Sequence, residues 1–105
     1  MKQKESELKT SILKWLRCQN DTFVFNVHTT GIPVGRTGKF RINFNKGIAD
    51  IIGVKKGRFF AFEVKTEDGK LNDNQRKWLE KVDSAGGYSC VVRSCTDAID
   101  AFNEI

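Results

Sequence analysis

Two short apolar runs separated by a turn limit what this chain can fold into more than any other feature. The runs cover residues 47–54 and 58–65, and a Lys-Lys-Gly turn at 55–57 lies between them. Apolar runs of this length around a glycine-containing turn predict two antiparallel strands joined as a hairpin. Asp50 lies inside the first run and Glu63 near the end of the second. Carboxylates embedded in apolar strands are costly to bury without a partner.

The charged residues of this hairpin are placed to meet. Residues two apart in a strand share a face, so Glu63 and Lys65 point the same way, and Asp50 can lie opposite or diagonal to Glu63. Two neighbouring carboxylates repel each other unless a cation neutralises them, and hard cations such as Mg²⁺ bind carboxylate and backbone carbonyl oxygens, here also that of Val64. Lys65 can stabilise an attacking hydroxide or the charge that grows on phosphorus. The pattern predicts metal-dependent hydrolysis of a phosphodiester.

Composition narrows the class of protein. The chain has 105 residues, 39% hydrophobic and 30% charged, which predicts one soluble domain spanning residues 1–105. The net charge of +5 favours an anionic partner such as nucleic acid. No apolar stretch reaches the ~20 residues of a membrane span, and we expect no signal peptide, no membrane partner and a cytoplasmic location. An odd number of cysteines without metal-site spacing argues against a disulfide framework, and the single histidine, His28, excludes a histidine-built metal site.

Periodicity and turn residues predict a mixed α/β protein in the order α-β-β-β-β-α-β-α. The first helix should carry Glu5 on the same stripe as the apolar Leu8 and Ile12, whereas Glu7 falls on the polar side. The second helix should begin at Asn72, which with Gln75 forms a capping-box pattern. The expected elements are a helix over 4–18, a strand over 23–28, an exposed loop over 29–38, a strand over 40–44, the hairpin, a helix from 72 to the Gly86-Gly87 pair, a strand over 88–93 and a short helix from Ser94.

The acidic pair and the lysine also carry a family resemblance. Asp50 followed by Glu63-Val64-Lys65 resembles the PD-(D/E)XK nuclease signature, and the wider chain resembles its VRR-NUC (virus-type replication-repair nuclease) branch. The segments that match this branch are Glu5-Ser6-Glu7-Leu8-Lys9, Thr30-Gly31, Lys46 to Gly53, Phe62 to Lys65, Leu71 to Gln75, and Ala85-Gly86-Gly87-Tyr88. The proline that usually precedes the acidic residue is replaced by Ala49, a substitution common in this branch.

The resemblance implies a restriction-endonuclease-like mixed sheet flanked by helices. It implies that Asp50 and Glu63 hold Mg²⁺ or Mn²⁺, that Lys65 is the catalytic lysine, and that a helical glutamate, for which we choose Glu5, completes the site. Gln75 matches a polar residue placed beside the site. No small-molecule cofactor is implied. Small stand-alone members are often phage-encoded, which would place the protein in the bacterial host cytoplasm, and they act as homodimers on branched DNA such as four-way junctions.

Each assignment has a simpler alternative. Lys65 could be a surface lysine, Glu5 could only favour the helix dipole, and Gln75 could only cap its helix. The whole chain could instead be a DNA-binding module or a replication-complex subunit that keeps the nuclease fold but cleaves poorly or needs a partner. Trp15 and Trp78 are most simply core residues. The glycine-rich segment 29–38, with Arg36, is expected to be a mobile loop that contacts DNA phosphates.

Overall fold

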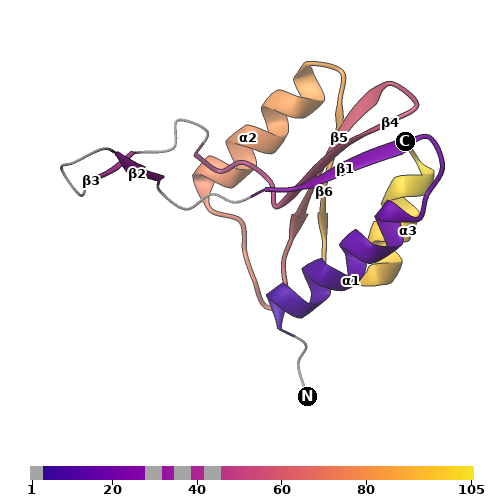
Figure 1. Cartoon of the computed structure of the whole chain (residues 1–105), viewed down its shortest axis with the longest axis horizontal. Helices are drawn as coiled ribbons and strands as arrows, with labels where there is room; N and C mark the ends of the chain where they lie inside the picture. Colours follow the sequence, from indigo (N-terminus) through magenta and orange to yellow (C-terminus); the bar gives the residue numbers. More distant parts are fainter. Residues whose placement is uncertain (1–3, 28–31, 35–38, 42–45) are drawn as a thin grey trace.

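A four-stranded mixed sheet forms the centre of the protein in the order β1-β4-β5-β6 (Figure 1). The computed structural model describes residues 4–27, 32–34, 39–41 and 46–105. Strands β1, β4 and β5 are antiparallel, whereas β6 runs parallel to β5. The elements are α1 (Glu5–Arg17), β1 (Thr22–Asn26), β2 (Ile32–Val34), β3 (Lys39–Arg41), β4 (Ile51–Lys55), β5 (Arg58–Val64), α2 (Asp73–Ser84), β6 (Tyr88–Val92) and α3 (Cys95–Asn103).

The β4–β5 hairpin turns through two residues with positive φ, Lys56 at 49° and Gly57 at 83°. A two-residue loop with both central residues left-handed matches the right-handed twist of the flanking strands. Lys55 therefore pairs with Arg58, and each step along β4 moves one residue back along β5, to Ile51 opposite Phe62. The hairpin predicted from sequence is confirmed, and its register decides where the charged residues at its open end meet.

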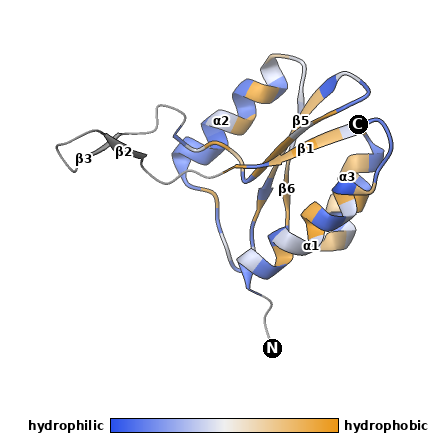
Figure 2. Ribbon diagram, viewed as in Figure 1, coloured by the Kyte–Doolittle hydropathy of each residue, from blue (hydrophilic) through white to orange (hydrophobic). Residues whose placement is uncertain are grey.

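Helices α1 and α3 cover one face of the sheet and α2 covers part of the other (Figures 1 and 2). The larger core lies under α1 and α3, where Leu8, Ile12 and Leu16 pack against Phe60 and Phe62. The second cluster, under α2, is smaller and centres on buried Ala49, Ala61 and Leu79. The core roles predicted for Trp15 and Trp78 are partly met, because both side chains are half-buried and pack against these clusters.

Both ends of α2 follow the sequence signals. Asn72 caps its N-terminus in a complete capping box with Gln75. At its C-terminus Gly86 takes a positive φ of 96°, and the N–H groups of Gly86 and Gly87 bond to the carbonyls of Asp83 and Val82. This pair of bonds is the Schellman arrangement that a left-handed residue after a helix permits. Helix α2 is therefore held in register over β5 and β6.

The predicted fold class, a mixed sheet flanked by helices, is confirmed. The structure adds one short strand, β2, inside the segment expected to be a loop, and β2 pairs with β3 in a separate two-stranded sheet. Residues 28–31, 35–38 and 42–45 lie outside the described residues, so the expectations for His28, Thr30-Gly31 and Arg36 stay predictions. Within the described ranges no helix is long and apolar enough to cross a membrane.

Candidate active site

The open end of the β4–β5 hairpin brings Asp50 and Glu63 together. Ile51 pairs with Phe62, so continuing the register by one residue sets Asp50 across from Glu63. The Asp50 carboxylate is fixed there, because its Oδ2 accepts a hydrogen bond of 3.0 Å from the Val64 backbone N–H. On its other side the Val27 N–H donates to the Asp50 carbonyl at 2.8 Å. The strand arrangement predicted from sequence thus places the two carboxylates side by side.

Glu63 is the most deeply buried charged group of the described chain, with 2% of its surface exposed. Its Oε1 accepts a hydrogen bond from Gln75 Nε2 at 3.2 Å, whereas its Oε2 is buried with no hydrogen-bond partner among the described residues. Burial raises the pKa of Glu63 to about 8, aided by the negative charge of the neighbouring Asp50. Removing water disfavours a carboxylate, and a second carboxylate disfavours it further. In the metal-free site the ionised form of Glu63 is therefore unfavourable.

Lys65 lies beside this pair. Its Nζ is 3.9 Å from Glu63 Oε1, and only 13% of its side chain is exposed. Lys65 opposes the effect of burial by lowering the pKa of Glu63, but burial and Asp50 outweigh it. The stem of Lys65 packs against Gly69, where an added Cβ would come within 3.3 Å of Lys65 Cδ. Glu63 and Lys65 therefore share a face, as the strand alternation predicts.

Gln75 links the second helix to the acidic pair. It completes the capping box with Asn72 through its backbone N–H and its Oε1, which leaves Nε2 free to donate to Glu63. Gln75 thus caps its helix and contacts Glu63 with the same side chain, and its role in the site stays a prediction. Gly47 allows α2 to approach this closely, because a Cβ there would lie 2.2 Å from the Asn74 carbonyl oxygen.

Glu5 is less closely engaged than the buried stripe suggested. It is the first residue of α1 and its side chain is exposed, as is that of Glu7. Its charge still reaches Glu63, where it makes a minor contribution to the raised pKa. In the ranges that the structure describes, no group of three or more His, Cys, Asp or Glu side chains is close enough to hold a metal ion. The structure brings together Asp50, Glu63, Lys65 and Gln75, and the ligand role of Glu5 stays a prediction.

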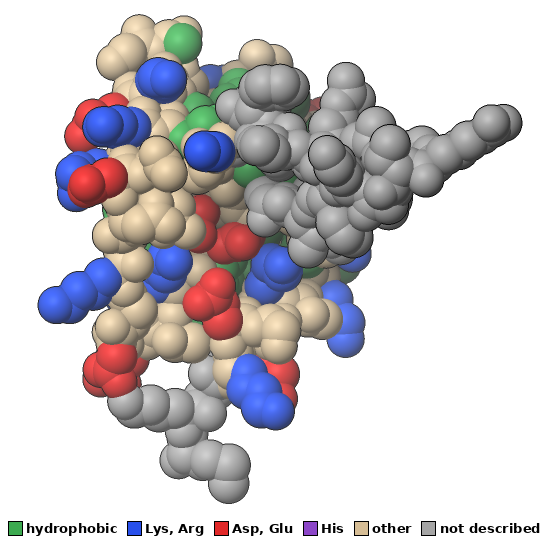
Figure 3. Space-filling view, turned by 90° about the vertical axis from the view of Figure 1, so that its left-hand side faces the viewer, with side chains coloured by type: hydrophobic (Ala, Val, Ile, Leu, Met, Phe, Trp, Pro, Cys, Tyr) green, Lys and Arg blue, Asp and Glu red, His purple; other side chains and the backbone are tan. Residues whose placement is uncertain are grey.

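The two carboxylates still suit a divalent cation. A buried carboxylate oxygen without a partner, next to a second carboxylate, is the kind of donor set that a hard cation prefers. The N–H of Val64 donates to Asp50, which shows that Val64 lies beside the acidic pair. The role of the Val64 carbonyl as a metal ligand stays a prediction. Figure 3 shows acidic side chains gathered at the centre of one face, with basic side chains on either side.

Sequence reasoning missed a contact that supports the site. The guanidinium of Arg93, just after β6, donates to the carbonyls of Thr66 and Gly69 at 2.9 and 2.6 Å. It thereby fixes the loop that follows Lys65. Neither periodicity nor a motif indicates this contact, because it depends on the parallel pairing of β5 with β6. The side chain of Lys55, at the end of β4, donates to the Phe102 carbonyl at 2.8 Å, a contact that the turn pattern at 55–57 does not indicate.

Comparison with known families agrees with this geometry. A model of the VRR-NUC domain matches residues 34–95, which include Asp50, Glu63, Lys65 and Gln75. A search of curated proteins finds no match. The match covers more than half of the chain and contains the whole β4–β5 hairpin and α2. The chain therefore belongs to the VRR-NUC domain family, nucleases of the PD-(D/E)XK type.

Proposed function

We propose that this protein is a divalent-metal-dependent endonuclease that hydrolyses DNA phosphodiesters. The observation that carries the proposal is the meeting of Asp50 and Glu63 at the hairpin end, with one buried Glu63 oxygen unpartnered and Lys65 beside it. A purely structural carboxylate pair would be expected to find hydrogen-bond donors for all its buried oxygens. The raised pKa of Glu63, to about 8, is typical of a group kept for chemistry.

Asp50, Glu63 and the Val64 carbonyl would hold Mg²⁺ or Mn²⁺, with Glu5 as a further ligand. A metal ion held there would lower the pKa of bound water and polarise the phosphate. The remaining roles belong to the side chains of Lys65 and Gln75. Lys65 supplies a positive charge next to the carboxylates, where it can stabilise negative charge on the attacking oxygen or the phosphate. Gln75 holds Glu63 in position through a hydrogen bond from α2.

The proposed substrate is branched DNA, cut by a homodimer with little dependence on sequence. One active site per chain cuts one strand per encounter. Resolving a four-way junction takes two matched nicks, which a two-fold dimer supplies most simply. The net charge of +5 supports phosphate contacts, which carry little sequence information and weaken as salt rises. The family resemblance implies the same substrate class. No small-molecule cofactor is proposed.

Cleavage by the Asp50→Asn variant tests the catalytic proposal. The asparagine Oδ1 can still accept the Val64 N–H, so the hairpin end should keep its structure. The loss of one negative charge should abolish cleavage in Mg²⁺ or Mn²⁺ while DNA affinity is retained. Asp73→Asn is the matched control, since Asp73 is exposed and forms an ion pair with Arg76, three residues further along the same helix. Full activity of Asp50→Asn would overturn the site.

The substrate proposal needs a separate comparison. Wild-type protein is incubated with linear duplex, flap, splayed-arm and four-way-junction DNA of shared sequence, at two salt concentrations. We expect junction or flap cleavage that falls with salt and is similar for unrelated sequences. Cleavage of linear duplex at one defined sequence would contradict it. Tight DNA binding without cleavage of any substrate would instead favour a DNA-binding subunit of a replication complex.

A further inference from the structure

The sheet face that α2 partly covers carries side chains in rows that run across the strands. One of these rows holds the acidic pair. The pairing of β1, β4, β5 and β6 sets Val27, Asp50, Glu63 and Val91 in the first row. The next row holds Phe25, Ile52, Ala61 and Ser89, and the third holds Phe23, Val54, Phe59 and Gly87. The second and third rows therefore contain no charged residue, although the second row adjoins the acidic row.

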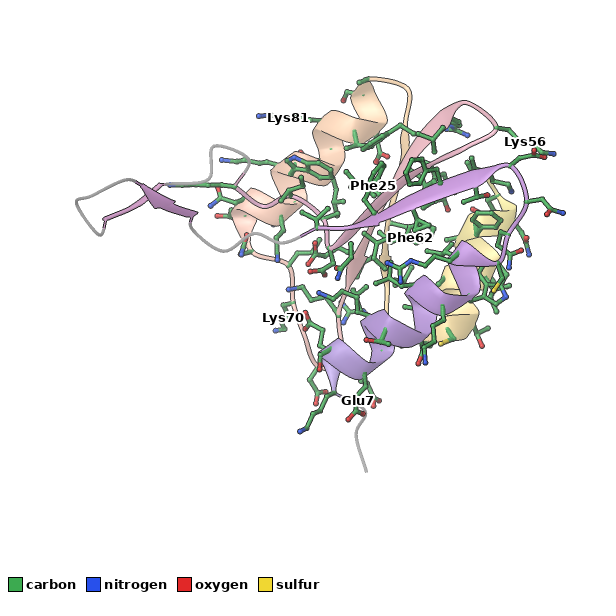
Figure 4. The ribbon with its side chains drawn as sticks, in the orientation of Figure 1. Glu7, Phe25, Lys56, Phe62, Lys70 and Lys81 are labelled. Atoms are coloured by element: carbon green, nitrogen blue, oxygen red, sulfur yellow. The ribbon has the colours of Figure 1, made fainter. Side chains whose placement is uncertain are left out.

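Helix α2 covers only part of this face. In the described chain, the large apolar side chains that remain exposed are those of Phe23 (65%), Phe25 (45%), Val54 (38%) and Phe59 (37%). All four lie in the second and third rows. Figure 2 shows β1 as an apolar strand that α2 does not reach, and Phe25 lies in the space between β1 and α2 in Figure 4. An exposed apolar patch of this kind on a small protein marks an interaction surface.

The patch has a protruding part and a hollow part. The rings of Phe23 and Phe25 stack on each other with centroids 4.5 Å apart, at the edge strand of the sheet. On the other side of Val54 lies a hollow of about 360 Å³, lined by Phe59, Trp78, Lys81, Val82, Ala85 and Gly87. Two strand spacings, about 10 Å, separate the protruding rings from this hollow. A knob and a hollow therefore stand side by side on one surface.

We propose that this face, with the Phe23–Phe25 knob and the hollow between β5 and α2, is the interface through which two copies of the chain form a two-fold dimer. In such a dimer each copy places its knob in the hollow of the other, because the same patch on both subunits must be self-complementary. The inference rests on the homodimer proposed above and assigns the surface that makes it.

Charge and area favour a second copy over other occupants. Nucleic acid binding depends on cations that meet phosphates. The two apolar rows offer none, and Lys81 is the single charged residue among those that line the hollow. Fully buried aromatic side chains contribute 150–250 Å² each, so the four exposed residues offer on the order of 300 Å² of apolar surface. That area suits the apolar core of an interface whose polar rim completes about 800 Å² per partner.

This arrangement also positions the two acidic rows. Asp50 lies one row from Phe25, about 7 Å along the strands. Both acidic rows would then border a single interface and lie on related sides of the two-fold axis. Matched nicks in two strands of one DNA branch point would follow from this placement.

Complementary variants test the interface. Phe23→Glu removes the knob from a position that is mostly in solvent, and Ala85→Arg blocks the hollow from an exposed helix end. Each change should raise the dimer Kd by at least about 100-fold, because every dimer loses two aromatic contacts near its centre. Mixing the two variants should restore a dimer, since one knob meets one intact hollow and the new carboxylate faces the new guanidinium. Thr10→Glu, exposed on α1, is the control that should remain dimeric.

Sedimentation velocity over a range of protein concentrations gives the result, and circular dichroism confirms that each variant is folded. A monomeric wild type, or two single variants that dimerise normally, would overturn the interface. If wild type is monomeric and Phe23→Glu abolishes its DNA binding, the patch contacts nucleic acid and the proposed interface is overturned. Metal-dependent nicking is scored separately. Nicking by a monomer leaves the catalytic proposal standing without this interface, whereas a dimer that cuts nothing does the reverse.

Discussion

Glu63→Gln should remove the pH dependence that the buried Glu63 carboxyl imposes on stability. The pKa of Glu63 is raised from 4.5 to about 8 in the folded metal-free protein, so the native state binds a proton that the unfolded chain has released. Stability from this group is complete below pH 4.5 and is lost as pH rises toward 8. The slope is about 1.4 kcal/mol per pH unit, which sets a ceiling of about 5 kcal/mol over the whole window.

A loss of that size matters for a small domain, whose total stability is typically about 5–15 kcal/mol. The glutamine amide is neutral at every pH, and its oxygen can still accept the hydrogen bond from Gln75. The variant should therefore be about as stable as wild type near pH 5 and several kcal/mol more stable near pH 9. It should also be inactive, because it lacks the charge that a divalent cation requires.

Urea unfolding in EDTA at pH values from 5 to 9, followed by the fluorescence of Trp15 and Trp78, measures the effect. Titrating groups that lie far from Glu63 cancel when the variant is compared with wild type at each pH. Glu67→Gln, at an exposed position in the loop after β5, should leave the wild-type curve unchanged. Mn²⁺ should stabilise wild type at high pH and have little effect on Glu63→Gln, since a ligand of the native state adds stability. If wild type is no less stable than Glu63→Gln at pH 9 without metal, the reasoning from burial is refuted.

Three further changes separate the roles of neighbouring residues. Glu5→Gln should reduce cleavage more than Glu7→Gln, because, of these two glutamates, Glu5 is the one whose charge contributes to the raised pKa of Glu63. Equal mild effects in a nicking assay would leave Glu5 as a partner of the helix dipole. Lys65→Ala should lower kcat by 100-fold or more in single-turnover assays while DNA affinity is retained, because the variant loses a group that stabilises developing negative charge. Lys70→Ala, at an exposed position, should leave kcat unchanged. Gly47→Ala should both lower the unfolding midpoint and abolish cleavage, since a Cβ there meets the backbone of α2 and the φ of 80° is strained for alanine. A variant with a normal midpoint and full cleavage would show that the close contact between residue 47 and α2 is not needed.

The arrangement of the strands and the acidic pair could be predicted because it depends on local rules. Alternation along a strand sets Glu63 and Lys65 on one face, and a two-residue turn at Lys56 and Gly57 fixes the hairpin register. Once that register is fixed, Asp50 must lie across from Glu63. The helix caps were equally readable, because a cap bonds to residues within one turn of itself.

The contacts between distant elements could not be predicted in this way. Glu5 lies at the expected helical phase, yet the position of α1 leaves its side chain exposed, since phase fixes the direction of a side chain and not what the helix packs against. The amide of Gln75 reaches Glu63 only because Gly47 lets α2 approach. Arg93 reaches the loop after Lys65 through a parallel pairing that the sequence does not specify.

On the partly exposed face of the sheet, too, some features follow from the sequence and others depend on packing. Aromatic and β-branched residues in β1 indicate a strand, but three consecutive apolar residues do not say which of its faces is covered. In the folded chain both Val24 and its neighbours Phe23 and Phe25 are apolar, but only the Val24 face is covered, by α1 and α3. The sequence thus determined the helices, the strands of the central sheet, their order and the acidic pair, because these depend on neighbours along the chain, whereas it did not indicate β2. The cover of each face, the supports of Glu63 and the exposed knob and hollow were decided only by tertiary packing, because they depend on where short helices can fit over a finite sheet.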